Sequence, residues 1–190
     1  MQKRICVFCG SSAGNRPEYA AAARGMARHL AASGIGIVYG GGRTGLMGAL
    51  ADAALEAGGD VIGVMPKALV EKEVAHTGLG DLRVVDSMHT RKALMAELAD
   101  GFIAMPGGYG TLEEFCEVLT WTQLGLQRKA CGLLNVNGYF DGLLAFFDHA
   151  VAERFVKPVC REMVIAGSEP AELVARLLAY EVPAVRKWDS

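Results

Sequence analysis

The sequence predicts an α/β protein whose helices cover both faces of a mostly parallel sheet of about seven strands. Short apolar runs rich in Val and Ile alternate along the chain with longer segments of helical periodicity. This alternation is typical of parallel sheets that are buried on both faces. The chain has 190 residues and no internal repeat, low-complexity tract or linker. One doubly wound, Rossmann-like domain over residues 1–190 is therefore expected.

The predicted elements follow one another in strict alternation. The strand-length apolar runs cover residues 4–10, 35–40, 60–66, 82–87, 101–107, 129–135 and 162–167. Segments with the 3.6-residue period of a helix cover residues 17–33, 44–58, 87–100, 110–125, 139–155 and 168–180. In such sheets ligands bind beyond the carboxyl ends of the strands, near the helix N-termini. A binding site is therefore expected just after one or more of the apolar runs.

The composition excludes several classes of protein. A hydrophobic content of 52% with 21% charged residues describes a compact soluble protein. The net charge of −2 gives no attraction to nucleic acid or to a membrane, and the basic residues do not alternate with aromatic ones. The N-terminal apolar run is too short for a signal peptide, and no stretch is long enough to span a membrane. We therefore expect a cytoplasmic protein that binds neither nucleic acid nor membranes.

The cysteines and histidines predict no metal or redox site. Residues 6–9 read CVFC, the spacing of a redox motif, but Cys6 lies inside an apolar strand pattern. Cys6 and Cys9 should then point to opposite faces of the sheet. The four histidines are dispersed and have no zinc-ligand spacing. The five cysteines are expected to be reduced, as in other cytosolic proteins.

The segment GGGRTG, residues 40–45, has the G-x-G-x-x-G spacing of a dinucleotide-binding turn between a strand and a helix. That site also needs an acidic residue at the end of the next strand. Here Asp60 begins the next strand, and Met65 and Pro66 end it. Dinucleotide binding is therefore disfavoured. Two readings stay open for Gly41 and Gly42: they line a phosphate or sugar pocket, or they allow a helix to pack closely on a strand.

The segment PGGYGT, residues 106–111, also follows an apolar run and precedes a helix. Its glycines permit positive φ, and Thr111 stands where an N-cap would. Amides turned inward at a helix N-terminus can hold an anion such as a monophosphate. The T-x-x-E spacing of Thr111 and Glu114 equally fits a capping box with no ligand. Glu113 and Glu114 are adjacent and should diverge around the helix.

The helix that begins near Ser87 carries an arginine on its apolar face. Arg91 lies among Met88, Leu94, Met95 and Leu98, whereas His89 and Lys92 lie off this face. The arginine could extend out of the core, or it could face an anion at the strand ends. Because the runs at 82–87 and 101–107 are consecutive, we expect them to be neighbours in the sheet. Arg91 and Glu114 would then meet over one pocket.

These motifs resemble the LOG family of cytokinin-activating phosphoribohydrolases. The family signature P-G-G-x-G-T-x-x-E is complete from Pro106 to Glu114, and SMHTRK at 87–92 precedes it. YGGG with GLMG at 39–48 and VFCGSS at 7–12 are also similar, so the resemblance covers nearly the whole chain. Members are often called lysine decarboxylases, but nothing in this sequence marks a lysine that would hold pyridoxal phosphate. We regard that description as misleading.

The resemblance implies hydrolysis of the N-glycosidic bond of an adenine nucleoside 5′-monophosphate, N6-prenylated AMP or AMP itself, without a cofactor. Arg91 and Glu114 correspond to the catalytic pair. Substrate- or phosphate-binding positions are implied at Ser12, Gly41, Gly42, Glu73, Met88, Lys92, Gly107, Gly108, Tyr109, Gly110, Thr111 and Thr120. Met88 suits a wall for adenine or, equally, a core position. A homodimer is also implied, with residues near the interface completing each site.

The chemistry of these residue types agrees with that activity. Breaking a ribosyl bond develops positive charge on the sugar, which a carboxylate such as Glu114 stabilises while it activates water. The glycine loop would grip the 5′-phosphate and position the sugar. A nucleotide-sensing domain without turnover is the alternative, since fold does not fix function. A third interpretation is transfer of the ribosyl group to an acceptor other than water.

Overall fold

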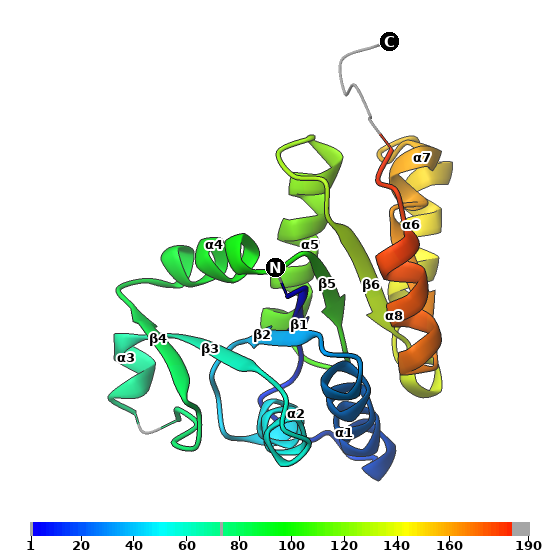
Figure 1. Ribbon diagram of the computed structural model, residues 1–190. Coiled ribbons are helices and arrows are strands. Elements are labelled where there is room, and N and C mark those ends of the chain that lie inside the picture. Colours follow the sequence, from blue (N-terminus) through cyan, green and yellow to red (C-terminus); the bar gives the residue numbers. More distant parts are fainter. Residues whose placement is uncertain (1, 73, 184–190) are drawn as a thin grey trace.

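The computed structural model describes residues 2–72 and 74–183, whose strands form one seven-stranded sheet (Figure 1). Every pair of neighbouring strands is parallel. All seven predicted runs contain a strand, so the predicted fold class is confirmed. The strands are β1 (Arg4–Phe8), β2 (Gly36–Tyr39), β3 (Val61–Pro66), β4 (Asp81–Val85), β5 (Gly101–Ala104), β6 (Ala130–Leu134) and β7 (Val164–Gly167).

The six predicted helices are present within a few residues of the expected limits. They are α1 (Pro17–Ala32), α2 (Gly45–Glu56), α4 (Met88–Leu98), α5 (Tyr109–Gln123), α6 (Asp141–Ala152) and α8 (Pro170–Ala179). Two short helices, α3 (Lys67–Val70) and α7 (Pro158–Arg161), and the 3₁₀ turn η1 (Val136–Gly138) were not expected. Each is too short to show a helical period in the sequence. Within the described ranges, no helix has the length and apolar character needed to cross a membrane.

The sheet separates two hydrophobic cores. One packs β1 and β2 against α1, α2 and α8, and the other packs the same strands against α4 and α5. Figure 1 shows α1 and α2 together on one side of β1–β3 and α4 on the other. Cys6 belongs to the second core and Cys9 to the first, so their predicted divergence is confirmed. None of the five cysteines forms a disulfide in the described part of the chain.

The strand order β4-β3-β2-β1-β5-β6-β7 places a topological switch point between β1 and β5. From β1 the chain adds strands in one direction, and from β5 it adds them in the other. Loops leaving neighbouring strands on the two sides of such a point separate, so a crevice forms at their carboxyl ends. Here the two loops stay joined at one place, where the Gly10 amide donates to the Pro106 carbonyl at 3.0 Å.

The expectation that the runs at 82–87 and 101–107 are sheet neighbours is wrong. β4 lies at one edge of the sheet, and β3, β2 and β1 separate it from β5. The connection between them is α4, which crosses back over these three strands and packs on them. This crossing carries Arg91 from the edge of the sheet toward its middle. The residues that the prediction brought together do meet, but through the helix rather than through strand pairing.

Candidate functional site

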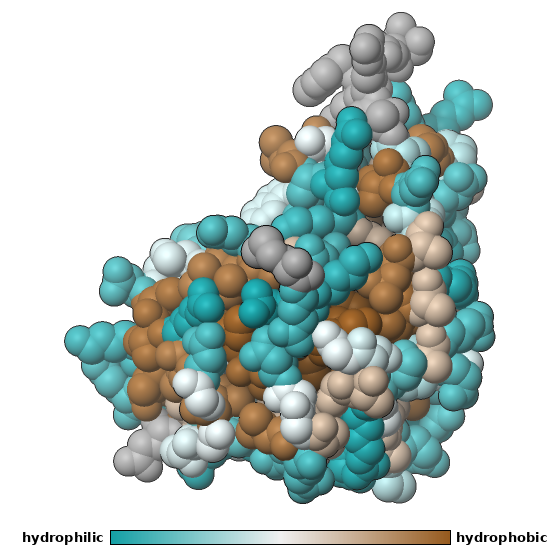
Figure 2. Space-filling view, in the orientation of Figure 1, coloured by the Kyte–Doolittle hydropathy of each residue, from teal (hydrophilic) through white to brown (hydrophobic). Residues whose placement is uncertain are grey.

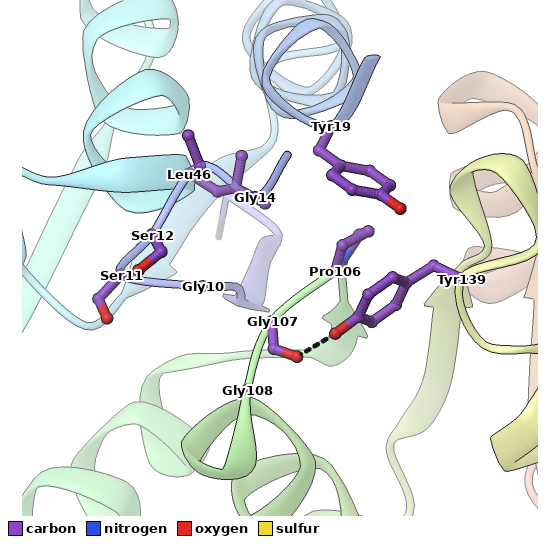
Figure 3. A pocket seen from close by; sticks show the side chains of 11 residues that line it. Gly10, Ser11, Ser12, Gly14, Tyr19, Leu46, Pro106, Gly107, Gly108 and Tyr139 are labelled. Carbon is purple, nitrogen blue, oxygen red and sulfur yellow. Dashed lines mark hydrogen bonds between the residues drawn. The ribbon is translucent and has the colours of Figure 1, made fainter. Parts of the chain in front are cut away.

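A cleft with two lobes lies at the carboxyl ends of β1 and β5. The first, the carboxylate lobe, has a volume of about 390 Å³ and is lined by Cys9, Gly10, Ser11, Met47, Leu69, Met88, Arg91, Gly108, Tyr109, Gly110, Thr111, Glu113 and Glu114. The second, the tyrosine lobe, has a volume of about 290 Å³ and is lined by Gly10, Ser11, Ser12, Ala13, Gly14, Tyr19, Leu46, Pro106, Gly107, Gly108 and Tyr139 (Figure 3). Gly10, Ser11 and Gly108 line both lobes. The lobes are therefore adjacent across this ridge, at the switch point of the sheet.

Arg91 and Glu114 form a buried ion pair in the carboxylate lobe. Nη1 of Arg91 donates to Oε1 of Glu114 at 2.6 Å, and each residue is only 8% exposed. Nε of Arg91 donates to the carbonyl of Val64 at the end of β3, at 3.0 Å. The arginine is thus held at two points, by a strand below it and by α5 beside it. The predicted meeting of Arg91 and Glu114 is confirmed.

Gly40 makes room for this arginine. A β-carbon at Gly40 would collide with Nη2 of Arg91, so only glycine leaves space for the guanidinium over the end of β2. Gly40 was not among the predicted site residues. Gly40 is the first residue of the GGGRTG turn, but the G-x-G-x-x-G spacing of that turn indicates a nucleotide and gives no sign of a neighbouring arginine. Its physical role is close approach of a charged side chain to backbone.

Two atoms of the pair remain open to the cleft. Oε2 of Glu114 and Nη2 of Arg91 have no hydrogen-bond partner within the described chain. Every fully buried side-chain nitrogen or oxygen atom there does have a partner. These two atoms are therefore not fully buried, and both residues line the carboxylate lobe. Burial raises the pKa of Glu114, the Arg91 guanidinium opposes this, and the nearby Glu113 carboxylate reinforces it. The site thus contains a carboxylate with one oxygen held and the other available to a ligand.

The start of α5 corrects the prediction for Thr111. The N-cap is Gly108, and the helix begins at Tyr109, so Thr111 lies inside the first turn. Glu114 binds Arg91 across to α4 and does not cap its own helix. The capping-box interpretation is therefore wrong. The first amides of α5, at Tyr109, Gly110 and Thr111, have no intrahelical acceptor and lie at the cleft. The helix dipole places partial positive charge there.

The glycines of the PGGYGT loop allow close packing or open space, and none of them is needed for a positive φ. None of Gly107, Gly108 and Gly110 has a positive φ. A β-carbon at Gly107 would collide with Oγ1 of Thr111 and lie 2.9 Å from the amide nitrogen of Gly10. Gly108 and Gly110 have open space around the same position. Gly107 thus lets the loop pack on the segment that follows β1, and the other two add no side chain at the rim.

Other predicted residues reach the cleft in part. Met88 is 45% exposed and lines the carboxylate lobe, so its alternative placement in the core is wrong. Ser12 lines the tyrosine lobe. Lys92 lies beside the cleft, where its ammonium pairs with Glu113 and, at 3.1 Å, with Glu117. Lys92 therefore braces α4 against α5. Glu113 faces this lysine and Glu114 faces Arg91, which confirms that the two glutamates diverge.

Three predicted residues are not brought to the cleft. Gly41 and Gly42 are buried and line neither lobe. Gly41 has φ +75° and packs against Leu82, and a β-carbon at Gly42 would meet Met47. Gly42 thus lets α2 pack closely, as in the second alternative, whereas the neighbours of Gly41 belong to β3 and β4. Thr120 lies on the outer side of α5, in a separate groove described below. Glu73 falls outside the described residues.

Sequence reasoning missed several residues that line the cleft. Leu69 comes from the short helix α3, and Met47 from the first turn of α2. Tyr19 and Tyr139 form one wall of the tyrosine lobe, with ring centroids 5.6 Å apart. Met47 lies within the GLMG segment, but no local motif marks Leu69, Tyr19 or Tyr139, because their positions depend on how distant elements pack. Across residues 2–72 and 74–183, no three His, Cys, Asp or Glu side chains lie close enough to hold a metal ion.

The chain is similar to a group of plant enzymes. A family model described as "Possible lysine decarboxylase" matches residues 47–177. Cytokinin riboside 5′-monophosphate phosphoribohydrolase LOG7 of Arabidopsis thaliana is 50% identical over 94% of this chain and 82% of its own. LOG1 of the same plant is 47% identical over 98% and 90%. The probable phosphoribohydrolase LOGL1 of Oryza sativa subsp. japonica is 49% identical over 98% and 86%.

Solved structures share the fold at much lower sequence identity. The molybdenum cofactor carrier protein of Chlamydomonas reinhardtii matches with a TM-score of 0.71 and 22% identity, over 95% of this chain and 100% of its own. The molybdenum cofactor binding protein of Rippkaea orientalis matches with the same values over 94% and 96%. At this identity the likeness concerns the fold alone.

The buried ion pair generates a prediction for stability. Arg91→Met leaves the Glu114 carboxylate buried without its cation, and we expect a loss of about 3–5 kcal/mol in the free energy of unfolding at pH 7. The double variant Arg91→Met/Glu114→Leu replaces both charges with apolar groups and should recover most of this loss. Urea unfolding followed by circular dichroism measures both. A double variant as unstable as the single one would contradict this explanation.

Proposed function

Because the chain belongs to the LOG family of phosphoribohydrolases, it is an N-glycosyl hydrolase of nucleoside monophosphates, and we propose which residues perform the reaction. The substrate is an adenine-type nucleoside 5′-monophosphate, AMP or N6-prenylated AMP, and the products are the free base and ribose 5-phosphate. Glu114 and Arg91 are the catalytic residues. The amides at the start of α5 bind the 5′-phosphate. No cofactor takes part in this scheme.

The observation that carries the proposal is the place of Glu114 on the same helix whose N-terminus opens the cleft. Thr111 and Glu114 are nearly one turn apart, which is about 5 Å along the helix axis. Side chains lean toward the N-terminus of their helix, so the carboxylate leans toward the free amides. A phosphate bound at those amides would place the attached ribose beside Glu114. The amides at the start of α5 thus suit the phosphate end of a ribose 5-phosphate, and the Glu114 carboxylate suits its C1′ end.

The reaction proceeds by cleavage of the bond between C1′ of the ribose and the base nitrogen. Both electrons of this bond leave with the base, and positive charge develops on the sugar. The open oxygen of Glu114 stabilises this charge and accepts a proton from the water that attacks C1′. The departing base gains a proton from solvent and leaves as a neutral molecule, and Glu114 later returns to solvent the proton that it took from the attacking water. Arg91 holds the other carboxylate oxygen and favours the ionised form of Glu114.

The base is expected to lie toward the apolar part of the carboxylate lobe. Met88, Met47 and Leu69 line that part, and they suit an adenine ring or a prenyl group. Among the described residues that line the two lobes, none is a lysine. Decarboxylation through pyridoxal phosphate would need a lysine amine in the site. The literal wording of the family model is therefore not supported by the residues of this cleft.

A second copy of the chain is proposed to cover α6 and the outer side of α5. α6 has no buried residue although most of its side chains are apolar, and Phe146 and Phe155 are 62% and 86% exposed. Figure 2 shows brown side chains over the C-terminal end of α5 and over α7. Thr120, implied as a substrate-contacting position, lies on this face in a groove of about 160 Å³. A dimer through this face would bring the groove next to a partner chain.

Release of free base is the direct test of the reaction. We expect the wild type to release base from AMP and from N6-isopentenyl-AMP, detected by chromatography. Glu114→Gln removes the charge but keeps the size of the side chain, and it should lower kcat by about 10²–10⁴-fold. Glu113→Gln is the matched control, because Glu113 faces Lys92, and it should keep most of the activity.

The outcomes separate the proposal from its alternatives. Full activity of Glu114→Gln would remove Glu114 from the chemistry. Binding of AMP without release of base by the wild type would indicate a nucleotide sensor. Formation of a new nucleotide only when an acceptor base is added would indicate transfer rather than hydrolysis.

The electrostatics of Glu114 predict the acid limb of the pH profile. The carboxylate acts in its ionised form, and burial raises its pKa above the ordinary value of 4.5. Activity should therefore fall, as the pH decreases, at a pH higher than that value. Glu113→Gln removes a charge that raises the pKa of Glu114, so the acid limb of the kcat/KM profile should shift to lower pH. Arg91→Gln removes the charge that lowers this pKa, so the acid limb of its residual activity should shift to higher pH. Shifts in the same direction for both variants would contradict this assignment.

The proposed dimer predicts an effect of a single charge on α6. Sedimentation should give twice the chain mass of 20.1 kDa for the wild type. Phe146→Asp places a charge in the covered face and should yield a monomer. Val84→Asp makes the same type of change at a side chain that is 52% exposed on the edge strand β4, and it should leave the dimer intact. A monomeric wild type would overturn the proposal.

A further inference from the structure

The two carbonyl groups at the start of the PGGYGT loop are both held by protein donors. The Pro106 carbonyl accepts from the Gly10 amide at 3.0 Å. The Gly107 carbonyl accepts from the hydroxyl of Tyr139 at 2.5 Å, the bond drawn in Figure 3. The second bond joins residues that are 32 positions apart in the chain. It is the point at which the η1 region touches the glycine loop.

The second bond sets the direction of the Gly108 amide. In a trans peptide, the carbonyl and the following N–H point in opposite directions, and the described chain has no cis peptide. Holding the Gly107 carbonyl toward Tyr139 therefore turns the Gly108 N–H away from it. Figure 3 shows Tyr139 on one side of the loop and Ser11 and Ser12 on the other. The amide thus points toward the ridge that both lobes share.

A peptide between two glycines needs a contact with another part of the protein to fix its orientation. Gly107 and Gly108 have no side chains that restrict the peptide between them, so rotation of this peptide costs little. Rotation would turn the carbonyl oxygen toward the ridge and the amide away from it. An anion at the ridge would then meet a negative dipole instead of a donor. One hydrogen bond to the carbonyl is enough to favour the orientation that accepts an anion.

Tyr139 is itself held rigidly. Its ring packs edge-on against Tyr19, with centroids 5.6 Å apart, and against Phe140 at 5.1 Å. Phe140 is buried, and its amide donates to the side chain of Asn135 at 2.7 Å. The side-chain amide of Asn135 in turn donates to Asp141 at 2.7 Å. The hydroxyl is therefore presented to the loop at a fixed place before any ligand arrives.

We propose that Tyr139 is a positioning residue for the 5′-phosphate, which it serves by fixing the Gly107–Gly108 peptide so that its amide faces the phosphate. This inference rests on the proposed function, because it concerns the same cleft. Tyr139 touches the loop and not the reacting atoms. Its removal should therefore weaken binding of the phosphate end of the ligand and leave the chemical step nearly unchanged.

The test compares Tyr139→Phe with Tyr180→Phe. Both variants keep the aromatic ring and lose a hydroxyl that donates to a backbone carbonyl. The Tyr180 hydroxyl donates to the Glu162 carbonyl at 3.1 Å, and Tyr180 lines neither lobe. For Tyr139→Phe we expect KM for AMP to rise about three- to tenfold with kcat within about twofold, as the loss of one hydrogen bond implies. Tyr180→Phe should resemble the wild type in both constants.

Binding measurements without turnover complete the test. Calorimetric titration with ribose 5-phosphate should give a Kd about three- to tenfold higher for Tyr139→Phe than for the wild type. Inhibition by free adenine, which lacks a phosphate, should be unchanged. An unchanged Kd for ribose 5-phosphate, an equal loss for adenine, or the same loss in Tyr180→Phe would overturn the inference.

The same titration distinguishes this inference from the proposed function. A wild type that binds ribose 5-phosphate but releases no base would contradict the proposed hydrolysis, and weaker binding by Tyr139→Phe would still support the role of Tyr139. Normal base release with identical constants for Tyr139→Phe would overturn the role of Tyr139 and leave the hydrolysis standing. A wild type with no affinity for ribose 5-phosphate would overturn the inference as well.

Discussion

The guanidinium of Arg91 and the carboxylate of Glu114 share a nearly dry space between α4 and α5. Removing two charges from water is costly, and a pair in such a place stabilises a protein less than apolar packing would. The surrounding structure supports the pair at several points. β3 supplies a carbonyl acceptor through Val64, Gly40 leaves room for the guanidinium, and Lys92 braces the two helices. Such support is expected where a charge is retained for chemistry.

The sheet topology explains why the site lies where it does. The switch point between β1 and β5 opens the crevice, and the bond from Gly10 to Pro106 joins its two sides. The helix after β5 then begins at the crevice with free amides and partial positive charge. α4 crosses from the sheet edge and adds the arginine. Free backbone amides and a buried carboxylate therefore lie next to each other because of the order of the strands.

The two lobes differ in chemistry in a way that fits a nucleotide. The carboxylate lobe contains the charged side chains together with Met88, Met47 and Leu69. The tyrosine lobe is lined by small residues, Leu46 and two tyrosines, without an ionisable carboxylate or amine among the described side chains. The charge of a bound phosphate is thus expected to be met by backbone amides at the start of α5 and at the ridge, rather than by side chains of the tyrosine lobe.

Local patterns in the amino-acid sequence were enough to predict the helices, the strands and the chemical groups of the site. Seven strands and six helices could be predicted because apolar periodicity is a local signal. Arg91 could be identified as an arginine that needs a partner, and Glu114 as a carboxylate beside a glycine loop. The resemblance to the LOG family joined the two into one site. These conclusions depend on residues within a few positions of one another, or on a motif.

How these groups meet depends on the tertiary structure. The separation of β4 from β5, the N-cap at Gly108 instead of Thr111, and the bond from Tyr139 to Gly107 depend on contacts between distant segments. The glycines of the GGGRTG turn likewise took their meaning from neighbours such as Arg91 and Met47. Local patterns carry no information about which distant side chain fills the space beside a backbone. Close packing makes that choice, because each space admits only the side chain that fits it.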